Sequence, residues 1–290
     1  MAEIVQLYPW IGFLFAALFG LVFGSFGNVI VARLPRMLEQ QWRQECQEAF
    51  ADEKEKKPTI KEKRFNLAYP ASHCPKCGHG LRWFENIPLL SYLLQRGRCR
   101  GCKAHISLRY PLTELAAALL TLAVVASFGF TYAALAFAVF LYALLLLTLI
   151  DAETMLLPDQ ITLPLLWLGL LLSIHVLPVS PTDAIIGGAA GYLFLWSVYW
   201  LFKLTTGKEG MGYGDFKLLA VLGVWLGWQA LPLIVLLSSL VGAAYGILMI
   251  IMSKHKQGNP MPFGPYLAVA GGIALFYAEP IYRWYWSFAI

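Results

Sequence analysis

Two aspartates stand where long apolar segments of the chain give way to polar ones. Asp151 directly follows the apolar run 141–150, and Asp215 follows the glycine-dense stretch 207–214 that separates two apolar segments. A carboxylate at the mouth of a membrane helix costs a few kcal/mol unless it is solvated, paired or protonated, so both residues indicate a functional site. Two aspartates at one membrane face predict a pair that shares a proton.

Such a pair can perform acid–base chemistry on a carbonyl group. One carboxylate would take a proton from water while the other, protonated, donates a hydrogen bond to the carbonyl oxygen. Gly212 and Gly214 carry no side chains, so an extended chain could approach the backbone beside Asp215. The competing interpretation is that Asp215 caps a helix starting at Phe216. Three further charged residues fit either substrate positioning or a solvated loop: Glu153, Lys208 and Glu209.

Asp159 has a different setting. It follows Pro158 and precedes an apolar run that is predicted to be helical. Aspartate is favoured at the position that precedes the first helical turn, where its oxygen accepts a free backbone N–H. The sequence therefore predicts that Asp159 is a helix N-cap and not a member of the acid pair.

Four cysteines form two Cys-x-x-Cys pairs. Cys74 and Cys77 are separated from Cys99 and Cys102 by a segment of twenty-one residues. Four thiolates in this spacing predict a closed tetrahedral site for a structural zinc ion, with no open position for water. Disulfides are disfavoured in a reducing cytoplasm, and a redox-active pair would not need two copies.

The neighbours of these cysteines have predicted supporting roles. Gly78 and Gly101 are expected to let the backbone turn tightly beside the sulfurs. Cys46 lies outside the pattern and is interpreted as a bystander. Because four thiolates complete the coordination of zinc, three neighbouring histidines are assigned to the surface or the outer sphere of the metal: His73, His79 and His105.

The elements that position these residues are predicted to be membrane helices. Of the 290 residues, 59% are hydrophobic and 13% are charged, and the mean hydropathy is +0.62, which excludes an ordinary soluble domain. The predicted fold class is all-α: a polytopic membrane protein of about eight transmembrane helices, with a small cytoplasmic zinc-binding insert after the first. The net charge of +5 is less informative than the placement of Lys and Arg.

The chain is predicted to contain three parts. Residues 1–32 hold the first transmembrane helix, about 10–32, which at 1.5 Å per residue spans a bilayer of roughly 30 Å. Residues 33–110 form the insert; its first half is expected to be a surface helix and a linker around Lys54. Residues 111–290 are predicted to form a seven-helix domain. Its helices are expected at about 112–128, 131–150, 159–177, 183–204, 216–229, 232–252 and 264–288.

The placement of basic residues orients these helices. Arg33 and Arg36 directly follow the first span, so the positive-inside rule puts the insert in the cytoplasm and both termini outside. With eight spans, both aspartates share the cytoplasmic face with the cysteines. Arg283 is then the only basic residue toward the outer side.

Several spaced motifs together resemble one family, the bifunctional type IV prepilin peptidases, or leader peptidase/N-methyltransferases. Besides the double Cys-x-x-Cys insert and the Leu-Leu-Pro-Asp run after Asp151, the resemblance covers nearly the whole chain. One residue departs from the pattern: Gly27 stands where relatives usually carry a larger apolar residue. The matching segments are Gly24-Ser25-Phe26-Gly27-Asn28-Val29, Lys208-Glu209-Gly210-Met211-Gly212-Tyr213-Gly214-Asp215 and Pro262-Phe263-Gly264-Pro265-Tyr266.

This resemblance implies an activity and its partners. Such enzymes cleave the short basic leader from prepilins and pseudopilins, the subunits of type IV pili and type II secretion, at the cytoplasmic face of the bacterial inner membrane. They then methylate the new N-terminal amine with S-adenosylmethionine. The family's catalytic aspartates correspond to Asp151 and Asp215, the latter in a Gly-x-Gly-Asp motif. The expected partners are the substrate's leader and N-terminal helix and the lipid bilayer, with no nucleic acid.

The residues that would bind the methyl donor are not evident from the sequence. No Gly-x-Gly-x-x-Gly follows a predicted strand, so a Rossmann site is not supported. The family associates methylation with the zinc-bearing insert, in which Gly97 is a candidate for shaping a loop. Two other classes are weighed against an enzyme. A transporter with an intramembrane acid pair would carry matching broken helices, of which the sequence has no sign, and a zinc-ribbon assembly scaffold would leave the aspartates without a role.

Overall fold

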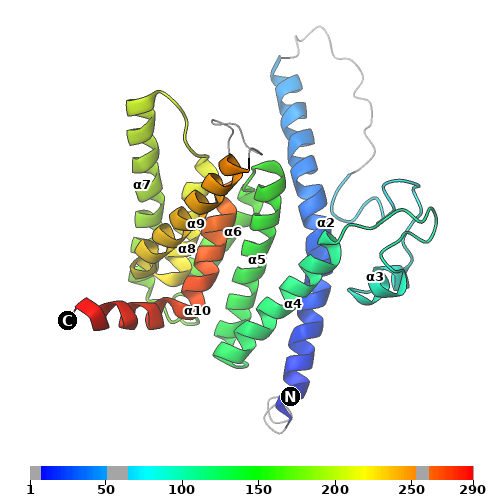
Figure 1. Ribbon diagram of the computed structural model, residues 1–290, viewed down its shortest axis with the longest axis horizontal. Helices are drawn as coiled ribbons and strands as arrows, with labels where there is room; N and C mark the ends of the chain where they lie inside the picture. Colours follow the sequence, from blue (N-terminus) through cyan, green and yellow to red (C-terminus); the bar gives the residue numbers. More distant parts are fainter. Residues whose placement is uncertain (1–7, 51–64, 253–260, 290) are drawn as a thin grey trace. The chain divides into compact units, whose positions relative to one another are not determined.

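A computed structural model of the chain describes residues 8–50, 65–252 and 261–289 (Figure 1). Within those residues the regular structure is helical, apart from two isolated β-bridges. The chain divides into two compact units, Met1–Val125 and Ala126–Ile290. The all-α fold class predicted from the sequence is therefore confirmed.

The first unit is built on one long helix. Helix α2 covers Pro9–Phe50, 42 residues, and contains Pro35. The sequence places the end of the first span near residue 32 and a separate surface helix from about residue 37, whereas α2 runs through both without a break. The remainder of the predicted linker, residues 51–64, lies outside the described residues.

Helices α2 and α4 pack closely through small residues. Helix α4 covers Arg109–Phe128. A Cβ atom at Gly20 would lie 2.6 Å from the Cα of Ala118, and one at Gly24 would lie 2.7 Å from the Cα of Glu114. Glycine is therefore required at both positions for the two backbones to approach, as is common between membrane helices. The Asn28 side chain adds a hydrogen bond of 3.1 Å from its Nδ2 to the carbonyl of Tyr110.

The four cysteines lie in the segment that joins these helices. This segment contains the short 3-10 helix η1, Trp83–Asn86, and the short helix α3, Leu90–Leu94. Its N-terminal end is attached to α2 by the Arg33 guanidinium group, which donates hydrogen bonds to three backbone carbonyls, those of Asn66, Leu67 and Pro70. Its C-terminal end leads directly into α4.

The second unit is a helical bundle with α8 at its centre. Helix α8 packs against α6, α7 and α10. These partners bury most of its surface, which is mainly apolar. The other helices surround it. The bounds are α5 Tyr132–Thr154, α6 Asp159–Leu172, α7 Pro181–Thr206, α8 Tyr213–Leu226, η2 Trp228–Ala230, α9 Leu231–Ile251 and α10 Gly264–Ala289.

Close packing fixes α8 in this bundle. A Cβ at Gly187 of α7 would lie 2.2 Å from the carbonyl oxygen of Gly223, so the α7–α8 crossing depends on glycine. On another side, the fully buried Trp225 donates from its Nε1 to the Leu165 carbonyl at 2.9 Å and stacks on Phe140, with ring centroids 4.8 Å apart. The last turn of α8 is therefore held on two sides.

Five helices within the described residues are long and apolar enough to cross a membrane, which identifies a multi-pass membrane protein. They are Trp10–Phe50, Arg109–Phe128, Tyr132–Thr154, Pro181–Thr206 and Trp228–Met249. The expectation of eight spans is not confirmed, although a helix is found at each of the eight predicted positions.

Length explains most of the difference. Helices α6 and α8 have 14 residues each, which at 1.5 Å per residue gives about 21 Å, short of a bilayer core of roughly 30 Å. The apolar run of α10 is interrupted by Glu279 and Pro280. The predicted division between residues 216 and 252 into two helices is confirmed, but the break comes at Gly227, whose φ is +81°, and not at Pro232.

Candidate active site and metal centre

Asp151 lies in the last turn of α5, with only 4% of its surface exposed. Its Oδ2 accepts a hydrogen bond of 3.0 Å from the backbone N–H of Gly264, the first residue of α10. A Cβ at Gly264 would lie 2.6 Å from the same oxygen, so glycine is required for this contact. The carboxylate therefore lies at the positive end of the α10 dipole, which favours negative charge.

Asp215 lies in the first turn of α8 and is 6% exposed. The helix begins at Tyr213, with Gly212 at the N-cap, so the interpretation of Asp215 as the cap of a helix starting at Phe216 is wrong. Its Oδ2 nevertheless accepts the N–H of Gly212 at 3.2 Å, which satisfies a free donor of the helix N-terminus. Both carboxylates thus lie at a helix N-terminus, that of α10 for Asp151 and that of α8 for Asp215.

The two aspartates belong to one site. Asp151 is close enough for its charge to act on Asp215. Leu157, in the connection between α5 and α6, lies between the two backbone segments: a Cβ at Gly214 would be 2.8 Å from the Cβ of Leu157, and one at Gly264 would be 3.1 Å from its Cδ2. Gly214, the glycine next to the aspartate in the Gly-x-Gly-Asp motif, thus leaves room for the Leu157 side chain.

The sequence predicts that Gly212 and Gly214 let an extended substrate approach the backbone beside Asp215. Gly214 instead packs on Leu157, while a Cβ at Gly212 would find its nearest neighbour, the Asp215 Oδ2, at 3.8 Å. Gly212 is therefore the less crowded of these two glycines, since an added Cβ would make only ordinary contacts. Sequence reasoning placed Gly264 in a matching motif but did not assign it to Asp151, because 113 residues separate the two partners.

Asp159 does not cap α6. Pro158 occupies the N-cap position, and the Asp159 carboxylate, the first residue of the helix, makes no cap hydrogen bond. It forms an ion pair with Lys217 of α8 instead, with Nζ 2.7 Å and 2.8 Å from its two oxygens. The predicted N-cap role is thus wrong, because the fold brings a cation from another helix within reach.

A second charged pair lies beside the loop that precedes α8. Glu209 accepts a hydrogen bond of 2.9 Å from Lys203 in the last turn of α7, and this hydrogen bond and the charge of Lys203 lower the pKa of Glu209. Lys203 also donates to the Tyr199 hydroxyl at 3.2 Å. Glu209 is therefore tied to α7 and is not a freely solvated loop residue. Lys208 has a backbone contact to Thr206, and Glu153 is exposed at the end of α5.

The four cysteine sulfurs form a cluster in the first unit. All four Sγ atoms lie within 4.8 Å of one another, and the Cys74–Cys102 and Cys77–Cys99 distances are 3.9 Å each. These cysteines are free, so disulfides are absent among them. Tetrahedral zinc with Zn–S bonds of about 2.3 Å would place its sulfurs about 3.8 Å apart. The cluster therefore fits a metal ion such as zinc.

The backbone prepares each pair of sulfurs in the same way. The N–H of Gly78 donates to the Cys74 carbonyl at 2.9 Å, and the N–H of Lys103 donates to the Cys99 carbonyl at 3.0 Å. Each Cys-x-x-Cys pair with its turn is called a knuckle here. The residue four positions after the first cysteine has a positive φ in both knuckles, +71° at Gly78 and +59° at Lys103. The N–H groups of Lys76 and Cys77 lower the pKa of the Cys74 thiol to about 6, which favours the thiolate form that metals bind.

The predicted roles of the neighbours are partly revised. Gly101 has no positive φ; a Cβ there would crowd its neighbours, at 3.3 Å from His79 and 3.4 Å from the Cys77 sulfur. Gly97, by contrast, has a φ of +65° and packs against Tyr92, which is consistent with a role in loop shape. Cys46 lies on α2 outside the cluster.

One buried carboxylate supports the cluster from outside. Glu85 accepts the N–H of Arg82 at 2.9 Å, lies 3.3 Å from the His79 Nε2 and pairs with Arg100 at 3.4 Å. The Arg82 N–H is the main cause that lowers the pKa of Glu85, followed by His79 and then Arg100. His79 thus has an outer-sphere position, as predicted.

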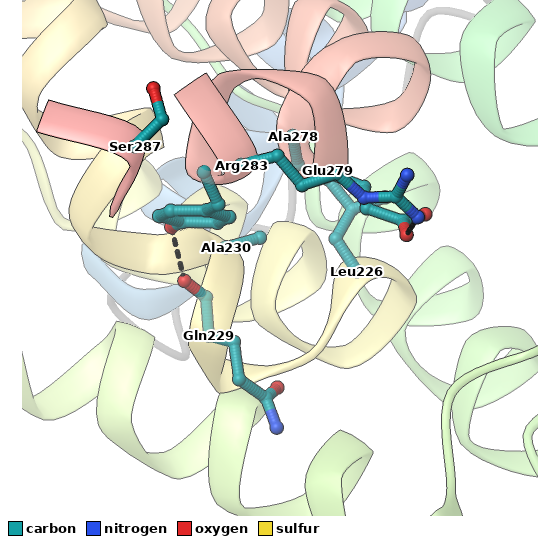
Figure 2. A pocket seen from close by; sticks show the side chains of 8 residues that line it. Leu226, Gln229, Ala230, Ala278, Glu279, Arg283 and Ser287 are labelled. Atoms are coloured by element: carbon teal, nitrogen blue, oxygen red, sulfur yellow. Dashed lines mark hydrogen bonds and ion pairs between the residues drawn. The ribbon is translucent and has the colours of Figure 1, made fainter. Parts of the chain in front are cut away.

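A cavity of the second unit lies away from the aspartates. It has a volume of about 720 Å³ and lies beyond the C-terminal end of α8, against η2 and α10 (Figure 2). Its polar groups are already engaged: the Tyr282 hydroxyl donates to the Gln229 carbonyl at 2.5 Å, and Arg283 pairs with Glu279. Neither Asp151 nor Asp215 lines it.

These features define a class: a multi-pass helical membrane protein with two buried carboxylates at helix ends and a separate four-cysteine metal-binding cluster. Comparison with known proteins narrows this class to one family. Residues 18–128 match the bacterial peptidase A24 N-terminal domain, and residues 138–247 match the type IV leader peptidase family. The chain belongs to the type IV leader peptidase family.

Individual relatives match this chain over nearly its full length. A prepilin leader peptidase/N-methyltransferase of Aeromonas hydrophila is 54% identical over 98% of this chain and 97% of its own. One of Pseudomonas aeruginosa is 54% identical over 100% and 98%, and one of Stutzerimonas stutzeri is 50% identical over 99% and 98%. No solved structure matches the chain significantly. The chain is thus an enzyme of the leader peptidase/N-methyltransferase kind.

Proposed function

We propose that this enzyme removes the basic leader peptide from type IV prepilins and pseudopilins at the cytoplasmic face of the bacterial inner membrane, and then methylates the new N-terminal amine. The single observation that carries the peptidase half is the pair of buried aspartates. Two carboxylates at 4% and 6% exposure each accept one N–H of a helix N-terminus, and neither pairs with a cation among the described residues. A shared proton is the simplest way to hold both.

The pair would hydrolyse a peptide bond by acid–base chemistry. The ionised carboxylate accepts a proton from water as the water oxygen attacks the scissile carbonyl, and the protonated one donates a hydrogen bond to the carbonyl oxygen. The proton taken from water then passes to the leaving nitrogen. Gly264 and Gly212 hold one oxygen of each carboxylate, which leaves the other available for the reaction.

The metal has a structural role in this proposal. Cys74, Cys77, Cys99 and Cys102 would hold one zinc ion, and the fit of the sulfur distances to a closed thiolate shell supports this assignment. Such a shell offers no position for water or substrate. Zinc bound there would organise the cysteine segment and take no part in peptide cleavage.

The methyl donor is S-adenosylmethionine by analogy with the relatives' methyltransferase name. The described residues form only isolated β-bridges, so they offer no strand on which a Rossmann-type site could be built. The methyl-transfer site is assigned to the cysteine segment on the resemblance alone. Neither a transporter nor a scaffold is favoured by the relatives.

The proposal is tested by co-expressing the enzyme with a type IV prepilin and weighing the pilin by mass spectrometry. Asp151→Asn and Asp215→Asn should each lower leader removal by at least about a hundredfold, because acid–base catalysis contributes about 10²–10⁴-fold. Wild-type enzyme should remove the leader and add one methyl group. A pilin supplied already cleaved should still be methylated by both variants.

Asp159→Asn is the matched control, since it also removes one carboxylate at the same end of the bundle. It should retain most activity at equal membrane expression. Efficient processing by either Asp151→Asn or Asp215→Asn would refute the peptidase assignment. Loss of processing in Asp159→Asn alone would show that Asp159 belongs to the catalytic pair in place of Asp151.

A further inference from the structure

A basic concavity lies beside the second cysteine knuckle, and its lining residues all belong to the first unit. It has a volume of about 680 Å³. Between residues 65 and 108 the chain has six Lys and Arg residues and one acidic residue, Glu85. The concavity collects most of this positive charge. Its lining residues are Leu94, Gln95, Arg96, Arg98, Arg100 and Lys103.

Most of this charge has no counterpart within the described part of the protein. Arg100 pairs with Glu85 and lies over the Phe84 ring, 5.1 Å from its centroid. Arg96, Arg98 and Lys103 form no side-chain hydrogen bond or ion pair with any described residue. Three cations gathered at one hollow, with the one local carboxylate engaged elsewhere, indicate an anionic ligand.

Apolar side chains stand next to these cations. Helix α3 exposes Leu90, Leu93 and Leu94, the last two at 70% and 67%. Leu94 also lines the concavity, so the apolar and the basic surfaces are continuous. Exposed leucines beside arginines are the composition of a segment that lies in the interface of a membrane.

A hydrogen bond attaches α3 near the N-terminal end of α4. Its N-cap residue, Leu89, donates its N–H to the Glu114 carboxylate at 2.8 Å. Glu114 is buried in the second turn of α4, a helix long and apolar enough to span a membrane. A bilayer crossed by α4 would therefore meet α3 at its surface.

We propose that α3 and the basic concavity form a lipid-docking surface for the anionic headgroups of the bilayer. The leucines of α3 enter the interface, and the phosphate groups of anionic lipids occupy the concavity beside Arg96, Arg98 and Lys103. A soluble anion would satisfy the cations but would leave the leucines in water. The charge of a zinc–thiolate centre would attract arginines but would likewise give the leucines no role.

The test uses the full-length, zinc-loaded protein in lipid nanodiscs, made either of phosphatidylcholine alone or with phosphatidylglycerol added. Hydrogen exchange at residues 89–98 should be several-fold slower with phosphatidylglycerol. Arg96→Gln/Arg98→Gln should abolish this difference, because each basic residue near an anionic surface contributes about fivefold in affinity. Leu93→Ser/Leu94→Ser should speed exchange in both kinds of disc.

The matched control is Lys76→Gln/Arg82→Gln, which removes the same charge from the same segment outside the concavity and should keep the lipid effect. Equal exchange in the two discs, or an equal loss in the control, would overturn the proposal. Protection by inorganic phosphate in phosphatidylcholine discs would identify a site for a free anion instead. Loss of zinc from Arg96→Gln/Arg98→Gln would show that these arginines serve the metal cluster, and would also overturn it.

Discussion

The metal cluster and the aspartate site are built at very different ranges along the chain. The first and last of the four cysteines are 28 positions apart, and each pair is shaped by a hydrogen bond that the cysteine carbonyl accepts from a residue four positions later. The aspartates lie in α5 and α8, and Asp151 is positioned by Gly264, 113 residues away in α10. A local turn can thus prepare a metal site, whereas the acid pair exists only when three helices are packed together.

This contrast predicts different responses to damage. Removing a ligand should abolish the metal site and disorder the surrounding segment, because its helices η1 and α3 have only 4 and 5 residues. Disturbing the aspartate site should instead leave its helices folded, since Trp225, Phe140 and the α7–α8 contact hold α8 independently of the carboxylates. The following substitutions test this contrast, beginning with the largest expected effect.

Cys77→Ser should have the largest effect on structure. Structural zinc binding is worth about 10–16 kcal/mol in small zinc domains, and the loss of one thiolate forfeits much of it. Purified wild-type protein should contain about one zinc per chain, and the variant should contain little, with fast hydrogen exchange over residues 72–106. Helices of the second unit should keep their protection. Wild-type protein without zinc, or an intact segment in the variant, would contradict the structural role.

Gly264→Ala should affect the aspartate site next most strongly. The added Cβ would lie 2.6 Å from the Asp151 oxygen, so the hydrogen bond to the α10 N-terminus must lengthen or break. Overpacking of this kind costs about 1–3 kcal/mol. We expect leader removal to fall at least tenfold, because the reacting carboxylate is displaced. The measurement is the rate of prepilin cleavage at matched expression.

Gly272→Ala is the control for that substitution. It lies in the same helix, and its Cβ would meet the Leu141 side chain at 3.7 Å, an ordinary contact. Activity should stay near wild type, because alanine is also a better helix former than glycine. Equal activity in the two variants would show that the Gly264 contact does not position Asp151.

The two regions also differ in how far the sequence predicts them. Cys-x-x-Cys spacing specifies the metal cluster, since both pairs are local and their sulfurs need only meet at one ion. The aspartates could be identified by their place at the ends of apolar runs, but not the partners that hold them. Asp159 was misassigned because nothing in the order of residues indicates that Lys217 lies beside it. Likewise, hydropathy located eight helices without showing that α6 and α8 are too short to span alone.

Asp159→Asn tests a contact of intermediate strength. The ion pair with Lys217 is partly exposed, 49% for the Asp159 side chain and 30% for that of Lys217, so its loss should cost no more than about 1 kcal/mol. A double-mutant cycle with Lys217→Met, read by thermal unfolding in detergent, measures the coupling between the two residues. A coupling of several kcal/mol would mean that this pair, and not helix packing, fixes α6 on α8.

The last substitutions test the backbone that the two knuckles share. Gly78 and Lys103 occupy equivalent positions with positive φ, a conformation that costs residues with a Cβ atom about 1–2 kcal/mol. Gly78→Ala should therefore weaken zinc retention, measured by competition with a chelator. Lys103→Gly should strengthen retention, though by less than 1–2 kcal/mol, since glycine gains freedom in the unfolded chain. Lys103→Ala removes the same charge but keeps the Cβ, so only the difference between the two Lys103 variants reports on the backbone. If Lys103→Gly and Lys103→Ala retain zinc equally, the left-handed residue is not a strained element of the second knuckle, and the equivalence of the two knuckles ends at their hydrogen bonds.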